Sequence, residues 1–125
     1  MTSPLAVLCY EKLLPGSQMV TRLEDMAYRV KVLNDSSQLA EVAQRSMPMV
    51  VLVDMVSQDH DVAKAIASLR SGAETSHIPV LAFATLDNEA GQEAARSAGA
   101  NMVASEEAIL NQLPSLLNHV LELNE

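Results

Sequence analysis

The stretch Met49-Val50-Val51-Leu52-Val53-Asp54-Met55 decides the fold class of this 125-residue chain. An unbroken apolar run of strand length leads to one aspartate, and such runs are typical of parallel-sheet strands that are covered on both faces. Leu5–Tyr10 and Pro79–Ala84 have the same character. The sequence therefore predicts three central strands, with Asp54 at the end of one of them.

Segments with helical spacing alternate with these strands. Their apolar residues recur at intervals of three and four, which predicts helices with one buried face. The stripes are Met19, Leu23 and Met26; Leu39, Val42 and Ala43; Val62, Ile66 and Leu69; Ala90, Ala94, Ala95 and Ala98; and Leu113, Leu116, Leu117, Val120 and Leu121. Two shorter strands are expected at Arg29–Leu33 and Asn101–Ala104. This alternation predicts one α/β domain, residues 1–125, with a parallel sheet and helices on both faces.

Residues that start and stop helices agree with this division. The expected starts are a capping box of Asp35 and Gln38, the N-cap residues Asp61 and Asp87, and the first-turn prolines Pro15 and Pro114. Helix ends are expected at Gly72 and Gly99, because glycine readily adopts the left-handed conformation that closes a helix.

The composition argues against several functional classes. The formal net charge is −8 and aromatic residues make up 2% of the chain, so the usual groups for binding phosphate backbones and unpaired bases are scarce. No apolar run approaches the roughly 20 residues of a bilayer span, and no signal-like segment opens the chain. The one cysteine, Cys9, cannot form an intrachain disulfide. We expect a cytoplasmic protein that binds neither nucleic acid nor membranes.

Enzyme motifs are also missing. The four glycines are too dispersed for a nucleotide-binding loop, and the three histidines lack the short spacing of a zinc site. No serine has the context of a nucleophile elbow. We therefore expect a protein that is not an enzyme.

A binding site is expected where the parallel strands end, because ligands of such folds collect beyond the carboxyl ends of the strands. Asp54 lies at such an end, and Glu11 lies beside it if the first and third strands are neighbours. Two carboxylates can hold Mg²⁺ together with water and phosphate. Alternatively, Glu11 is a solvated loop residue and Asp54 a strand-end or helix-capping residue.

The order of these features resembles the receiver domain of two-component response regulators, the CheY-like family. The resemblance rests on Pro48–Arg70, on His77-Ile78-Pro79-Val80-Leu81 and on Ala98-Gly99-Ala100-Asn101, and it extends over essentially the whole chain. It implies a flavodoxin-like doubly wound sheet with strand order 2-1-3-4-5. It also implies that Asp54 accepts a phosphoryl group from a histidine kinase, with Mg²⁺ held by acidic residues after the first strand.

Several residues depart from the receiver pattern. Tyr10 and Glu11 match the acidic pair, so the resemblance implies weak Mg²⁺ binding by Glu11 and Asp54 alone. Ala84 replaces the hydroxyl residue that ends the fourth strand, and Thr85 follows one position later as a possible substitute. Val103 stands where receivers have an aromatic residue in the fifth strand, and Glu106 stands where they have a lysine after that strand. A carboxylate at that position repels phosphate, so the phosphorylation site is expected to be incomplete.

Three functions remain open at this point. The first is an atypical receiver module of a phosphorelay, acting with a histidine kinase or an effector protein. The second is a pseudo-receiver that binds protein partners without phosphorylation, and the third is a small flavodoxin-like enzyme or ligand carrier. Receivers commonly associate through the fourth helix, fifth strand and fifth helix, so partner contact or a homodimer is expected on that surface, next to Glu89 and Glu93.

Overall fold

A five-stranded, all-parallel sheet forms the centre of the computed structural model, which describes residues 4–9, 13–33, 38–55, 61–85 and 87–123. The strands are β1 (Leu5–Cys9), β2 (Arg29–Leu33), β3 (Val50–Asp54), β4 (Val80–Ala84) and β5 (Met102–Ser105). They follow the order β2-β1-β3-β4-β5. Both the parallel pairing and the predicted order are confirmed.

The three central strands are the three apolar runs of the sequence. Every residue of β3 and β4 is buried, whereas the edge strand β2 is mostly exposed. Val7 of β1 pairs with Val51 of β3, and Val51 pairs with Val80 of β4. Uniformly apolar sequence marks the centre of the sheet because only central strands are covered on both faces.

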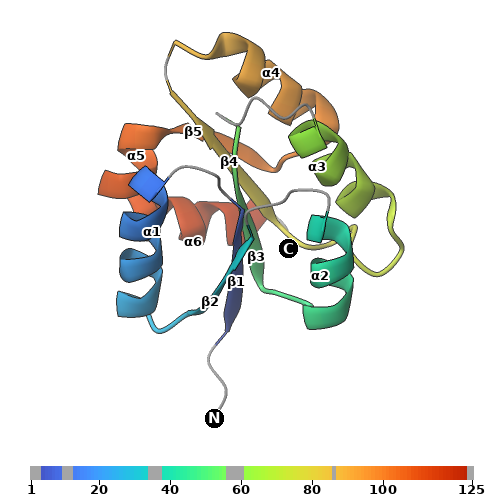
Figure 1. Cartoon of the computed structure of the whole chain (residues 1–125), viewed down its shortest axis with the longest axis horizontal. Helices are drawn as coiled ribbons and strands as arrows, with labels where there is room; N and C mark the ends of the chain where they lie inside the picture. Colours follow the sequence, from blue (N-terminus) through green and yellow to red (C-terminus); the bar gives the residue numbers. More distant parts are fainter. Residues whose placement is uncertain (1–3, 10–12, 34–37, 56–60, 86, 124–125) are drawn as a thin grey trace.

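Six helices cover the two faces of the sheet in the described part of the chain. They are α1 (Leu13–Asp25), α2 (Leu39–Ser46), α3 (Asp61–Ser71), α4 (Glu89–Ala98), α5 (Glu106–Asn111) and α6 (Leu113–Leu123). Figure 1 shows α1, α5 and α6 on one side of the sheet and α2, α3 and α4 on the other. None of the helices, as far as they are described, is long and apolar enough to cross a membrane.

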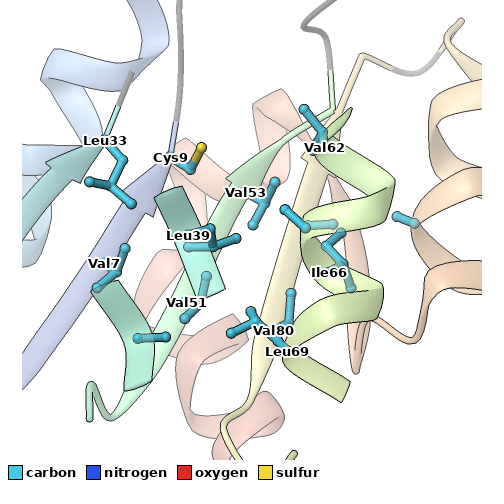
Figure 2. Close-up of a cluster of buried hydrophobic side chains, with 14 of the residues drawn as sticks. Val7, Cys9, Leu33, Leu39, Val51, Val53, Val62, Ile66, Leu69 and Val80 are labelled. Atoms are coloured by element: carbon cyan, nitrogen blue, oxygen red, sulfur yellow. The ribbon is translucent and has the colours of Figure 1, made fainter. Parts of the chain in front are cut away.

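Each side of the sheet has its own apolar core. Figure 2 shows the core under α2 and α3, where Val51, Val53 and Val80 meet Leu39 and Ile66. On the other side, Leu52, Leu81 and Phe83 pack against α1, α5 and α6. Successive residues of each strand thus join opposite cores, as the alternation of side chains in a strand requires.

Two helix predictions were wrong and one was incomplete. Asn88, not Asp87, caps α4, because its side chain accepts a hydrogen bond from the Gly91 amide. Gln38 is the N-cap of α2 and makes no capping bond with its side chain, and Asp35 lies outside the described residues. The predicted last helix, from Leu113 to Leu121, is α6, but the short helix α5, which ends just before Gln112, was not predicted.

The alanine stripe of α4 is also less buried than predicted. Only Ala95 is fully buried, Ala94 and Ala98 are half-buried, and Ala90 is exposed. The exposed face includes Glu89 and Glu93, as expected. Because alanine side chains are small, α4 buries less apolar surface than a helix with larger apolar residues at these positions.

Arg70 joins three segments on the α3 side of the sheet. Its guanidinium donates to the carbonyls of Ser76 and Gly99 and to Oδ1 of Asn101, which also accepts from the Val80 amide at 2.9 Å. Burial lowers the pKa of Arg70 from its usual value, yet arginine stays protonated in proteins. The end of α3, the start of β4 and the turn before β5 are therefore held by one cation.

Gly99 confirms the predicted end of α4. Its φ of 109° lies in the left-handed region, and its amide donates to the carbonyls of Ala95 and Arg96. A Cβ here would lie 2.7 Å from Cγ of Arg70. Glycine is therefore required both for the helix ending and for the approach of Arg70.

Candidate functional site

Asp54 closes β3 at the carboxyl edge of the sheet. Its side chain is only 3% exposed, and it is one of two buried polar residues among those described. Phe83 of β4 stands beside it in register, and the Met55 amide donates to the Phe83 carbonyl at 2.9 Å. β1 is the other neighbour of β3, and Glu11, which was expected beside Asp54, lies outside the described residues.

A hollow of about 230 Å³ lies at the same edge, beyond β4 and β5. Its lining residues are Thr85, Asp87, Ser105, Glu106 and Glu107. The register brings Ala84 next to Ser105 at the two strand ends. Two hydroxyls and three carboxylates thus gather there, and none of the described lining residues is basic.

The residues at the predicted switch positions lie in different surroundings. Ala84 is fully buried and belongs to the core under α2 and α3, against which Val103 also packs. Thr85 follows the strand, is half-buried and borders the hollow. Because Thr85 lies beyond the end of β4, its role as a substitute for a hydroxyl at Ala84 stays a prediction.

Glu106 begins α5 and is half-buried at the rim of the hollow. Ser105 caps that helix by accepting from the Ala108 amide at 3.1 Å, so its hydroxyl is already engaged. Glu106 and Glu107 fill the first turn, where the partial positive charge of the helix stabilises carboxylates. A carboxylate at Glu106 is therefore stabilised by the helix that it begins.

The first turn of α4 is fastened to the ends of β3 and β4. Oδ1 of Asn88 accepts from the Gly91 amide at 3.0 Å, and Nδ2 approaches the Met55 carbonyl at 3.5 Å. The Thr85 carbonyl accepts from the Asn88 amide at 3.0 Å and from Nε2 of Gln92 at 3.1 Å. Met55, which follows Asp54, and Thr85, which follows β4, thus both contact residues at the start of α4.

The metal prediction falls partly outside the described residues. Tyr10, Glu11 and Lys12 are not described, and neither are Val56 and Leu86. Among the described residues, no three histidine, cysteine, aspartate or glutamate side chains are arranged to hold a metal ion. Asp54 is therefore the described carboxylate on which the predicted Mg²⁺ site depends.

Sequence reasoning missed Ser105 and Asn88 at this edge. Ser105 precedes two glutamates and then Ala108, Ile109 and Leu110, which is the pattern of an N-cap followed by an acidic first turn. Asn88 is as good an N-cap residue as Asp87, and the sequence gives no means of choosing between adjacent candidates. The sequence pattern after Ser105 is therefore enough to identify it as a helix cap, whereas the choice of Asn88 depended on the tertiary structure.

The comparisons with solved structures identify the fold. The receiver domain of a sensor histidine kinase from Pseudomonas aeruginosa, solved with magnesium coordinated in its active-site cleft, superposes with a TM-score of 0.86. The two chains are 18% identical, and the match covers 97% of this chain and 99% of that one. No protein-family model matches the sequence, and no curated protein matches it significantly.

Two further structures agree. The receiver domain of a modulated diguanylate cyclase from Desulfovibrio desulfuricans gives a TM-score of 0.81 at 15% identity, covering 98% of this chain and 96% of that one. The receiver domain of a histidine kinase from Syntrophus aciditrophicus gives 0.82 at 13%, covering 96% and 91%. The chain has the receiver-domain fold, as the resemblance implied.

Proposed function

We propose that this chain is an atypical receiver module of two-component signalling, in which Asp54 is the phosphoacceptor of an incomplete site. Two features at the carboxyl edge of the sheet together support the proposal. A buried aspartate ends the central strand β3 of a receiver fold. Three carboxylates, and no basic group among the described residues, line the hollow beyond the next two strands.

The missing groups determine how well this site performs the chemistry. Phosphoryl transfer depends on positioning and on the stabilisation of charge on the equatorial oxygens. Ala84 has no hydroxyl to donate, and Glu106 opposes the charge that a lysine neutralises. Each lost contact to a charged group is worth roughly 1.5 to 3 kcal/mol. Losing two slows the reaction by about two orders of magnitude or more.

Mg²⁺ is the cofactor that this proposal includes. Asp54 and Glu11 would hold it, and the ion would neutralise charge on the phosphoryl oxygens. Tyr10 contributes no charge where receivers have a second acid. Binding is therefore proposed to be weak.

The principal alternative is a pseudo-receiver that acts by binding proteins without phosphorylation. The substitutions at Ala84 and Glu106 favour it, because they remove the hydroxyl and the cation together. Both proposals describe a cytoplasmic signalling domain and not an enzyme with its own substrate. An enzyme or ligand carrier is less well supported, since the hollow beyond β4 and β5 is small.

The test is to follow the intact mass of the protein with acetyl phosphate and Mg²⁺. We expect slow, partial modification of the wild type and none of Asp54→Asn. The double substitution Ala84→Ser with Glu106→Lys restores a hydroxyl and a cation, so its rate is expected to rise by about two orders of magnitude. Equal, rapid modification of the wild type and the double variant would contradict an incomplete site. No modification of either protein would favour the pseudo-receiver.

Partner contact is proposed on the surface of α4, β5 and α5. The exposed residues Glu89, Ala90 and Glu93 present small and acidic groups there. Exchanging both glutamates for lysine is expected to weaken self-association or partner binding at least tenfold, because rim charges govern association rates and exclude wrong partners. Analytical sedimentation and pull-down experiments measure the effect.

A matched control makes the same change of charge away from α4, β5 and α5. Glu41 of α2 and Glu74, which follows α3, are exposed, and replacing both by lysine should leave association unchanged. Equal loss in the two variants would indicate an effect of net charge and not of the α4 surface. Unchanged association of the Glu89 and Glu93 variant would exclude this surface.

A further inference from the structure

Asn88 contacts two elements that have separate roles at the candidate site. Its Oδ1 accepts from the Gly91 amide in the first turn of α4, and its Nδ2 lies 3.5 Å from the carbonyl of Met55, the residue after Asp54. The amide orientation follows from these partners, because the Gly91 amide needs an acceptor and the Met55 carbonyl needs a donor. One side chain thus bridges the end of β3 and the start of α4.

Gly91 allows the close approach of Asn88. A Cβ at Gly91 would lie 2.5 Å from Nδ2 and 2.9 Å from Cγ of Asn88. Any larger residue would displace the amide group that reaches the Met55 carbonyl. The pairing of Asn88 with Gly91 therefore keeps the bridge in place, over and above the helix cap that many other residues can supply.

The contact with Met55 is long enough to respond to small movements. At 3.5 Å it lies at the outer limit of a hydrogen bond, so a shift of a few tenths of an ångström strengthens or breaks it. The contacts that join α4 to β4 are firmer, since the Thr85 carbonyl accepts at 3.0 and 3.1 Å. Of the two connections, the contact between Asn88 and the Met55 carbonyl is thus the longer and the more easily changed by a small movement.

We infer that Asn88 is a positioning residue that couples the state of Asp54 to the first turn of α4. A change at the Asp54 carboxylate moves the adjoining Met55 peptide, and Asn88 passes that movement to the Gly91 amide. Ala84 lacks the hydroxyl and Val103 the aromatic ring expected at the receiver switch positions, whereas this path uses groups that the chain retains. The inference rests on the proposed function in that Asp54 is taken as the signalling residue.

The test is a double-substitution cycle that uses no phosphate. Asn88→Asp keeps an oxygen that accepts from the Gly91 amide and removes the donor to the Met55 carbonyl. Asp54→Asn perturbs the carboxylate in both backgrounds. We expect Asp54→Asn to shift the amide resonances of Gly91 and Gln92 when residue 88 is asparagine and to leave them unchanged when it is aspartate.

A matched control removes a donor from the neighbouring contact. Gln92→Glu adds the same charge on α4 and breaks the bond to the Thr85 carbonyl, while the Met55 contact stays. Asp54→Asn should still shift the Gly91 resonance in that background. A purely structural role for Asn88 would change α4 in the single variant without removing its response to Asp54.

The unfolding equilibrium gives a second readout. Independent sites multiply their effects on the unfolding constant within about twofold, so a larger departure for Asp54→Asn with Asn88→Asp supports coupling. If Asp54→Asn does not fold, Asp54→Ala serves in its place. An unaltered Gly91 response in the Asn88→Asp background overturns the inference. Failure of the proposed function is seen separately, as the absence of phosphorylation in the mass measurement.

Discussion

Replacing Phe83 by alanine is expected to lower the free energy of unfolding by about 3–5 kcal/mol, as for other buried aromatic residues cut back to alanine. Phe83 is the one phenylalanine of the chain and is fully buried in β4, where it packs with residues of α1, α5 and α6. Its ring fills space between three helices and the sheet, so its removal leaves a cavity that those elements cannot close together. Urea denaturation followed by circular dichroism measures the change.

The same substitution at the sheet edge provides a comparison. Val32 of β2 is 39% exposed, and Val32→Ala is expected to cost less than about 1 kcal/mol, because little apolar surface is lost. A loss below about 1 kcal/mol for Phe83→Ala would show that the core refills the space. Since Phe83 stands beside Asp54 in register, a cavity there would also loosen the backbone that positions the acceptor.

Replacing Arg70 by methionine is expected to destabilise the fold by about 3 kcal/mol. Methionine preserves much of the apolar stem but leaves the acceptors at Ser76, Gly99 and Asn101 without their common donor. Hydrogen bonds to a charged group are worth about 1.5–3 kcal/mol each, and the loss is smaller than their sum because water reaches part of the site. Chemical denaturation provides the measurement.

Two further arginine variants separate geometry from charge. Arg70→Lys keeps the charge but lacks the planar fork that reaches three acceptors, so it should recover only part of the stability. Arg45→Met breaks an ion pair with Glu41 whose side chains are 71% and 72% exposed, and should change stability by less than about 1 kcal/mol. Equal effects of the Arg70 and Arg45 methionine variants would contradict the bridging role of Arg70.

Negative charge gathers at the carboxyl edge of the sheet. The hollow beyond β4 and β5 is lined by Asp87, Glu106 and Glu107, and carboxylates near a phosphoryl group repel it. If phosphorylation of Asp54 is slow, a partner protein would therefore bind the α4 surface mainly while the chain is unphosphorylated. The Asn88 bridge offers a way for any change at Asp54 to reach that same surface.

The sequence was sufficient for the parallel sheet and for the position of Asp54. Long apolar runs identify buried strands because both faces of each strand lose contact with water, which is a property of the run itself. The sequence did not reveal α5, because a helix of six residues gives too short a periodic pattern to be recognised. The same limit explains the choice of Asp87 over Asn88 as the cap of α4.

By itself, the sequence determined the α/β architecture, the aspartate at the end of β3, and the absence of a hydroxyl at Ala84 and of a cation at Glu106. These features depend on residue type and on local periodicity. Only the tertiary structure decided that Ser105 and Thr85 share a hollow with Glu106, that Arg70 joins three segments, and that Asn88 links Met55 to α4. The contacts of Arg70 with Gly99 and Asn101 and of Asn88 with Met55 join residues that are about 30 positions apart. Such pairings arise from packing, on which the local pattern of a chain carries little information.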